Sequence, residues 1–263
     1  PAAVLAFAFL GFSYASEVRQ ERSHDVTIDM SRWYRRDWKK CRSATTMQLV
    51  DGAVHIVSEQ SGGLFWQIPM LRGTPMAWDP DEHTWLDECK RPPVSFNREV
   101  KRRGLDDLLD VGELRYVTWR WKVDHSTVDD ANLVDKKGKV RKKYDDFPAM
   151  IGISMLKKDS DTVREIAYVW TRSLPESTMV TAETTVIPLI WKMKWRRIVA
   201  ESGTENFGHW VQESHDLYED YRRGYPGEEP GKVLRIYLMT DTDNTKSRSA
   251  AWYADIVFQR HPP

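Results

Sequence analysis

The sequence has few cysteines and no net charge, and each of these features excludes a class of protein. Only Cys41 and Cys89 occur among 263 residues, with neither a CxxC motif nor a Cys/His cluster, so the spacing excludes a zinc site. Lys plus Arg and Asp plus Glu both number 39. Because the chain lacks the basic excess that neutralises phosphates, we expect no nucleic-acid partner.

The usual catalytic motifs are also missing. The sequence contains no GxSxG elbow, no HExxH pair and no glycine-rich phosphate loop, and its seven histidines are scattered. Glycoside hydrolysis by Asp146 with Asp241 or Asp255 would require the two carboxylates about 5 to 9 Å apart across a cleft, which a sequence does not show. We therefore favour a non-catalytic protein and assign no catalytic residue.

Helical periodicity is scarce, and β-strand patterns dominate. Tyr116–Val123 alternates between apolar and polar residues, and Asp51-Gly52 joins two β-rich runs as a hairpin turn. One clear helix is expected over Gly208–Arg223, and a second, short helix over Phe96–Leu109. The pattern predicts an all-β fold, a two-sheet antiparallel β-sandwich that is jelly-roll-like with one helix in the C-terminal half. The other expected strands are Thr45–Val50, Ala53–Ser58, Leu64–Ile68, Phe147–Leu156, Ile166–Thr171, Val180–Ile190, Trp195–Glu201, Val233–Met239 and Ala251–Phe258.

An uncharged apolar run, Pro1–Ala15, opens the sequence. A helix of this length spans only about 22 Å, less than the roughly 30 Å hydrocarbon core, so a cleaved secretory signal and a membrane-anchoring segment both remain open. Either interpretation predicts an exported, periplasmic protein, with membrane contact through residues 1–15 in the second. For such a protein, Cys41 and Cys89 are either a disulfide or two buried thiols.

The sequence divides into two expected parts: the apolar segment 1–16 and a single β-sandwich domain over 17–263. Within the domain, an excursion at about 71–113 breaks the strand pattern. It is rich in proline, glycine and charge, and it holds Trp78 and Trp85, which need a surface to pack on.

Two carboxylates and an amide follow one expected strand as Asp241-Thr-Asp243-Asn244. Alternation places Asp241 and Asp243 on the same side, where they and Asn244 would offer hard oxygen ligands to calcium. The competing interpretation is a turn, since Asp, Thr and Asn side chains also bond nearby backbone N–H groups. Calcium is the only cofactor that the sequence suggests.

From about Tyr116 onward, the order of motifs resembles a bacterial exported family known as domain of unknown function 3047. The motifs are Trp119-Arg-Trp121-Lys-Val, Asp145-Asp146-Phe147-Pro-Ala, Tyr168-Val-Trp170, Trp210-Val-x-Glu213, Tyr218-Glu-Asp220-Tyr221-Arg-Arg, Met239-Thr-Asp241-Thr-Asp243-Asn244-Thr and Trp252-Tyr253-x-Asp255-Ile. The resemblance implies a β-sandwich that looks like carbohydrate-binding modules, and it implies no activity. The chain departs from the family pattern at Tyr144, commonly Gly, and at Met150, commonly basic.

Two function classes follow. The first is a glycan-binding module of the cell envelope, because aromatic rings stack on sugar rings and neighbouring acids bind hydroxyl groups; most of the twelve tryptophans would still serve packing. The expected ligand-binding residues are Trp119, Trp121, Asp146, Trp170 and Trp252. The second is a structural accessory subunit of a membrane-associated complex, anchored by the apolar N-terminus and contacting an envelope protein through the excursion.

Overall fold

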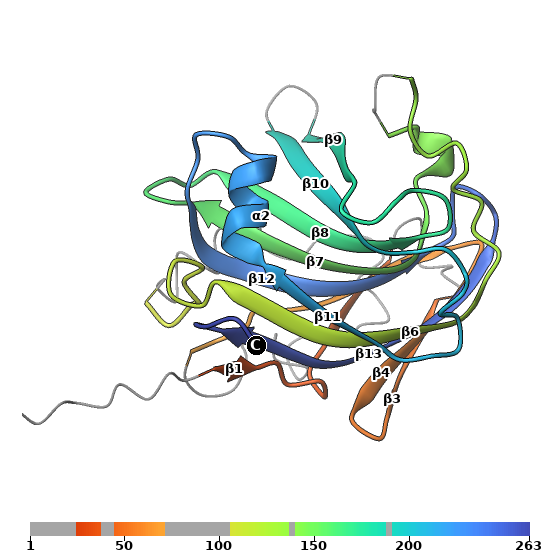
Figure 1. Ribbon diagram of the computed structural model, residues 1–263, viewed down its shortest axis with the longest axis horizontal. Helices are drawn as coiled ribbons and strands as arrows, with labels where there is room; N and C mark the ends of the chain where they lie inside the picture. Colours follow the sequence, from red (N-terminus) through yellow and green to blue (C-terminus); the bar gives the residue numbers. More distant parts are fainter. Residues whose placement is uncertain (1–24, 38–44, 72–105, 137–139, 188–190) are drawn as a thin grey trace, which may run out of the picture.

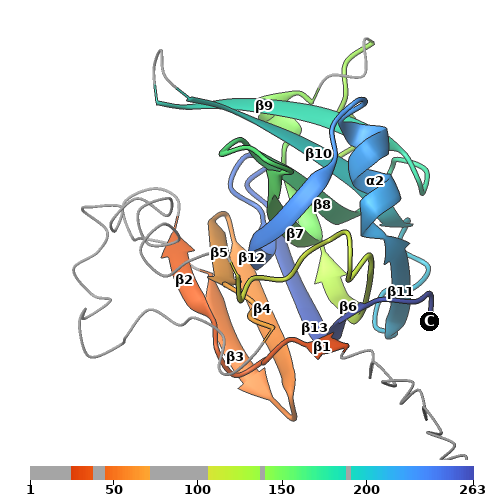
Figure 2. The same cartoon turned by 90° about the vertical axis from the view of Figure 1, so that its left-hand side faces the viewer.

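The computed structural model describes residues 25–37, 45–71, 106–136, 140–187 and 191–263, which form two packed β-sheets (Figure 1). β7, β8 and β12 lie over β6 and β13 in this view. Figure 2 shows α2, the single α-helix among the described residues, beside β11 at the end of the molecule away from β2 and β3. A short 3-10 helix spans Lys142–Tyr144. The sandwich expected from the strand patterns is therefore confirmed.

The first sheet contains six strands, all of them paired antiparallel, and we call it sheet A. Its order is β11-β6-β13-β4-β3, and β1 pairs with the end of β13. The strands are β1 (Val26–Thr27), β3 (Thr46–Val50), β4 (Ala53–Glu59), β6 (Tyr116–Ser126), β11 (Val211–Asp216) and β13 (Arg248–Gln259).

The second sheet, sheet B, has seven strands in the order β2-β5-β12-β7-β8-β10-β9. β10 pairs antiparallel with β9 but parallel with β8, so the expectation of purely antiparallel sheets is wrong at this one place. The chain leaves β8, forms the edge strand β9 and returns as β10, which lies between β8 and β9. The strands are β2 (Tyr34–Asp37), β5 (Gly62–Gln67), β7 (Phe147–Lys157), β8 (Val163–Thr171), β9 (Met179–Ile187), β10 (Trp191–Ser202) and β12 (Pro230–Asp241).

The core lies between the two sheets and follows from the alternation along β6. Val117, Trp119, Trp121 and Val123 have no exposed surface. The residues between them lie on the other face of sheet A. A second hydrophobic cluster covers the outer face of sheet B, where Leu133, Val134 and Val140 of the β6–β7 connection pack against residues that include Phe147, Met150 and Tyr237. Only sheet A thus keeps an uncovered outer face among the described residues.

The predicted helix over Gly208–Arg223 is only half correct. Its first part is the edge strand β11, which pairs with β6, and the helix α2 spans Leu217–Gly224. Asp216 ends the strand and caps the helix by accepting a 3.0 Å hydrogen bond from the backbone N–H of Glu219. Three features mark the change from strand to helix: alternating burial along β11, the cap at Asp216, and an acidic residue three positions after the cap.

Parts of the expected organisation lie outside the described residues: segment 1–16, both cysteines, Trp78, Trp85 and most of the short helix over Phe96–Leu109. The described end of the excursion, from residue 106, is a turn with isolated bridges, where Leu108, Leu109 and Val111 are fully buried. This end therefore belongs to the core. Within the described ranges, no helix has both the length and the hydrophobicity to cross a membrane.

A half-buried ionic cluster attaches α2 to the sandwich. The His215 ring packs against Trp119 and Tyr168, with ring centroids 5.2 and 4.2 Å away. Its two nitrogens lie 3.6 Å from Glu213 and 3.4 Å from Asp220. Asp220 also accepts a 3.0 Å hydrogen bond from the Tyr168 hydroxyl and pairs with Arg223. Burial is the largest single influence on the pKa of His215 and lowers it, but Asp220 and Glu213 outweigh burial, so the pKa is raised.

We expect this cluster to make stability depend on pH. Because the pKa of His215 is raised by folding, its contribution is complete below the unfolded-state pKa of about 6.5 and is lost as pH rises through the folded-state pKa. Urea unfolding should give a smaller free energy at pH 9 than at pH 6, and His215→Gln should reduce that difference. His125→Gln, at an exposed position, is the matched control and should leave the difference intact. Equal pH dependence in wild type and His215→Gln would contradict the assignment.

Gly152 and Tyr237 are opposite one another on β7 and β12, and the tyrosine ring occupies the space above the glycine. A Cβ atom at position 152 would lie 1.9 Å from Cζ of Tyr237, which is buried and donates a 2.7 Å hydrogen bond to Glu165. Gly152→Ala should therefore lower the free energy of unfolding by about 1 to 3 kcal/mol, the usual cost of overpacking. Denaturant unfolding measures this, with Ser214→Ala on the exposed face of β11 as control; an unchanged midpoint in Gly152→Ala would refute the contact.

Candidate functional site

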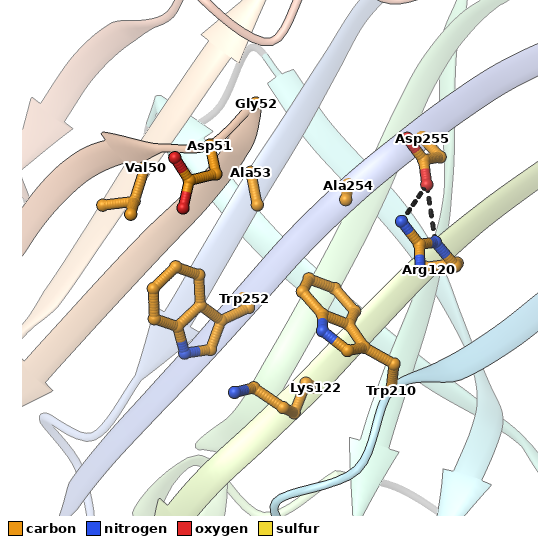
Figure 3. A pocket seen from close by; sticks show the side chains of 10 residues that line it. All are labelled: Val50, Asp51, Gly52, Ala53, Arg120, Lys122, Trp210, Trp252, Ala254 and Asp255. Atoms are coloured by element: carbon orange, nitrogen blue, oxygen red, sulfur yellow. Dashed lines mark hydrogen bonds and ion pairs between the residues drawn. The ribbon is translucent and has the colours of Figure 1, made fainter.

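A shallow hollow of about 410 Å³ lies on the outer face of sheet A (Figure 3). Four neighbouring elements form it: β6, β13, the β3–β4 hairpin and the residue that precedes β11. Its lining residues are Val50, Asp51, Gly52, Ala53, Arg120, Lys122, Trp210, Trp252, Ala254 and Asp255.

Strand alternation and register place the central residues. Arg120 and Lys122 point outward because Trp119 and Trp121 point into the core. Lys122 pairs with Trp252 across the β6–β13 ladder, and Trp210 stands next to Val211, the partner of Trp121. Residues directly opposite on neighbouring strands contact one another, so the two tryptophans lie on either side of Lys122.

Two unusual backbone conformations form the rim. Asp51 and Gly52 have φ angles of 50° and 79°, as a tight turn between β3 and β4 requires, so the expected hairpin is confirmed. Asp255 has φ 52° within a bulge of β13, where the register shifts between Ala254 and Val257. Bulges re-aim side chains, and this one directs the Asp255 carboxylate to Arg120.

The floor of the hollow is aromatic. One face of Trp252 stacks on His55, with ring centroids 4.1 Å apart and planes 13° apart. Trp210 is 40% exposed, unusual for so large an apolar side chain. Figure 3 shows the two indole rings side by side above sheet A, with Lys122 and Arg120 beside them.

The two cations beside the rings are paired with carboxylates. Arg120 forms a 2.5 Å ion pair with Asp255, and Lys122 lies 2.8 Å from Asp124, which also accepts a 2.6 Å hydrogen bond from Nε1 of Trp252. Burial raises the pKa of Asp124, but the bonds from Lys122 and Trp252 prevail and the pKa is lowered. Burial lowers the pKa of His55, so its imidazole is neutral at pH 7.

The pairing of Asp124 makes this residue unsuited to act as a general acid near neutral pH. A general acid active near neutral pH needs a raised carboxyl pKa, whereas Asp124 has a lowered one. Aromatic faces with paired polar groups at their edges bind a ligand that is apolar on one side and polar at its rim.

Three of the expected ligand-binding residues are core residues instead. Trp119, Trp121 and Trp170 are fully buried, and their rings contact one another and Tyr168 between the sheets. A ring without exposed surface has no face for a soluble ligand. Asp146 is also fully buried, at the start of β7, away from the hollow. Trp252 is the member of the expected set that lines the hollow.

Trp210 is the residue that sequence reasoning placed wrongly, within the helix expected over Gly208–Arg223. Two signals indicate its true position: Gly208, with φ 80°, ends the preceding loop, and burial alternates along the strand that follows. Arg120 and Lys122 pair with Asp255 and Asp124, and Asp145 pairs with the buried Arg197.

The expected metal ligands lie in a second place, at the end of β12. One carboxylate oxygen each from Asp146, Asp241 and Asp243 lies within 4.8 Å of the other two. Burial, followed by the neighbouring carboxylates, raises the pKa of Asp241 well above its ordinary value. Asn244 joins the cluster through Nδ2, which donates a 3.0 Å hydrogen bond to Asp146. Its amide thus positions a carboxylate in this structure.

Comparison with solved structures finds distant similarities. An agarase, AgWH50C, matches with 7% identity and a TM-score of 0.32, covering 90% of this chain and 25% of the agarase. A loop-swap mutant of Necallimastix patriciarum Xyn11A matches with 5% identity and a TM-score of 0.32 over 86% of this chain and 100% of that one. A third match is the xyloglucanase domain of NopAA, a type three effector from Sinorhizobium fredii, in complex with cellobiose. It has 10% identity and a TM-score of 0.37, covering 90% of this chain and 97% of that one. TM-scores this low establish no common activity.

No curated protein matches the chain. A family model does, over residues 104–257, which contain β6 to β12 and most of β13. The matched segment includes Trp119, Asp146, Trp210, Asp241 and Trp252. By this match, the chain belongs to the family described as "Protein of unknown function (DUF3047)".

Proposed function

We propose that this protein is a non-catalytic module that binds a neutral glycan in the hollow on the outer face of sheet A. The observation that carries the proposal is the pair of surface tryptophans, Trp210 and Trp252, beside each other on a rigid sheet. Sugar rings present C–H groups on their faces and hydroxyls at their edges, so they fit an aromatic floor with a polar rim.

The stacking surface is held in place before a ligand arrives. His55 supports Trp252 from one side, and the hydrogen bond from Nε1 of Trp252 to Asp124 prevents rotation of the ring. Sites on strands with side chains fixed by their neighbours lose little conformational entropy on binding. Trp252 is therefore the anchor, and the more exposed Trp210 provides the second contact.

The charges favour a neutral saccharide over an acidic one. The two cations that line the hollow are each matched by a carboxylate, Arg120 by Asp255 and Lys122 by Asp124. An acidic sugar would have to compete with these carboxylates for the cations. A neutral sugar instead accepts hydrogen bonds from the guanidinium and ammonium groups and donates its hydroxyls to the carboxylates.

We also propose that the protein works outside the cytoplasm, in the periplasm. The apolar run Pro1–Ala15 supports export. The partner of the hollow is then an envelope or environmental glycan. The alternative, an accessory subunit held by residues 1–15 and a protein contact at 71–113, depends on segments that lie mostly outside the described residues.

The test is binding of neutral polysaccharides to the whole chain. Affinity electrophoresis in gels with β-glucan, xylan, mannan or agarose should retard the protein in at least one gel. Titration with the matching oligosaccharide should change tryptophan fluorescence saturably. Trp210→Ala and Trp252→Ala should each weaken binding about tenfold or more, the loss of roughly 1.4 kcal/mol that a central aromatic contact provides.

Trp195→Ala is the matched control, since Trp195 is a half-buried tryptophan on β10 of sheet B. This variant should bind like wild type. Thermal unfolding of each variant confirms that its fold is intact. The proposal fails if no neutral glycan binds, if Trp195→Ala weakens binding as much as Trp210→Ala does, or if only acidic polysaccharides bind.

A further inference from the structure

The acidic cluster lies at a corner where the chain crosses from one sheet to the other. β12 of sheet B ends at Asp241, and residues 242–247 lead to β13 of sheet A. Asp241 is paired with Phe147, so the residue just before β7, Asp146, lies beside it. The three carboxylates thus come from two adjacent strand ends and from the crossing loop.

Asp146 organises this loop. Its Oδ1 accepts hydrogen bonds from the backbone N–H and Nδ2 of Asn244, at 3.1 and 3.0 Å. Its Oδ2 accepts bonds from the backbone N–H and hydroxyl of Thr245, at 2.6 and 2.5 Å. These four donors hold the Asp146 carboxylate in place.

Asp241 has no comparable partners. Its residue is only 9% exposed, and Oδ1 is buried without any hydrogen-bond donor. The buried cation on this side of sheet B, Arg197, forms its ion pair with Asp145. A buried carboxylate oxygen next to two further carboxylates is unfavourable unless a positive charge compensates it.

We propose that Asp146, Asp241 and Asp243 bind one calcium ion. Calcium takes oxygen ligands at about 2.3 to 2.6 Å, so oxygens on opposite sides of the ion lie about 4.6 to 5.2 Å apart. The three ligand oxygens are within 4.8 Å of one another, a separation that one calcium ion can span. Magnesium demands near-ideal octahedral geometry at about 2.0 to 2.1 Å and keeps several waters, so it is less suited to a site of three protein carboxylates.

Asn244 is a positioning residue for this ion. Its amide nitrogen donates both to Asp146 and, at 3.2 Å, to the backbone carbonyl of Asp145, which fixes the loop against the start of β7. Calcium bound here joins the end of β12, the start of β7 and the crossing loop. The site lies apart from the glycan hollow and is independent of it.

The experiment measures thermal unfolding and calorimetry of the full chain after removal of metals with a chelator. Calcium chloride should bind at one ion per chain. At calcium about one hundred times its dissociation constant, Tm should rise by about 5 to 10 °C. Magnesium chloride should give a clearly smaller shift at equal concentration.

Asp241→Asn keeps the size of the side chain and removes its charge. This variant should be at least as stable as wild type in chelator, because the repulsion among carboxylates is relieved, and its Tm should no longer respond to calcium. Asp243→Asn provides the same readout if Asp241→Asn does not fold. Asp159→Asn, in an exposed turn at φ 56° that asparagine tolerates, is the control and should respond like wild type.

Three outcomes would overturn the proposal. The first is a wild-type protein with neither calorimetric heat nor a Tm shift from calcium. The second is an undiminished calcium response in Asp241→Asn or Asp243→Asn, which would place the ion elsewhere. The third is an equal or larger response to magnesium, which would assign the site to a different cation.

Discussion

The contact between the aromatic residues of β6 and β8 is the interaction on which the rest of the structure depends. Trp119 packs on Tyr168 with ring centroids 5.0 Å apart, and Trp121 packs on Trp170 at 5.6 Å. All four rings are fully buried, and they join sheet A to sheet B. Since side chains alternate along a strand, this packing leaves Arg120 of β6 on the outer face, where the hollow forms.

The two outer faces of the sandwich differ because, within the described residues, only one of them is covered. Hydrophobic residues of the β6–β7 connection, among them Leu133 and Val140, pack on sheet B. On sheet A, Trp210 and Trp252 remain accessible instead. Large aromatic rings left at a surface lose favourable burial, and their position at one place is what the proposed glycan site requires. The same asymmetry separates the proposed glycan site from the calcium site at the corner of the molecule.

At the corner that holds the acidic cluster, buried polar groups are stabilised in two ways, by a network of hydroxyl groups and by hydrogen bonds from loop donors to a carboxylate. Thr45, Ser58, Ser61 and Thr242 are buried and share a network of hydroxyl hydrogen bonds where β4, β5 and the loop after β12 meet. The carboxylate of Asp146 is likewise satisfied by loop donors. Asp241 is the exception in this region, because its Oδ1 is buried without a hydrogen-bond donor, and the cation proposed for this site would provide what neighbouring donors do not.

The sequence by itself determined most of the strands, though not β1, β2 or β11, together with the Asp51-Gly52 hairpin and the grouping of Asp241 with Asp243, because these depend on neighbours along the chain. It did not determine which tryptophans are exposed: a period of two separates the faces of a strand but does not say which face meets the second sheet. The half of the predicted helix that is β11 shows the same limit, since its pairing with β6 outweighs local helical spacing. Trp210 and Trp252, and likewise Asp146 and Asp241, are far apart in sequence and meet only through strand pairing in the tertiary structure.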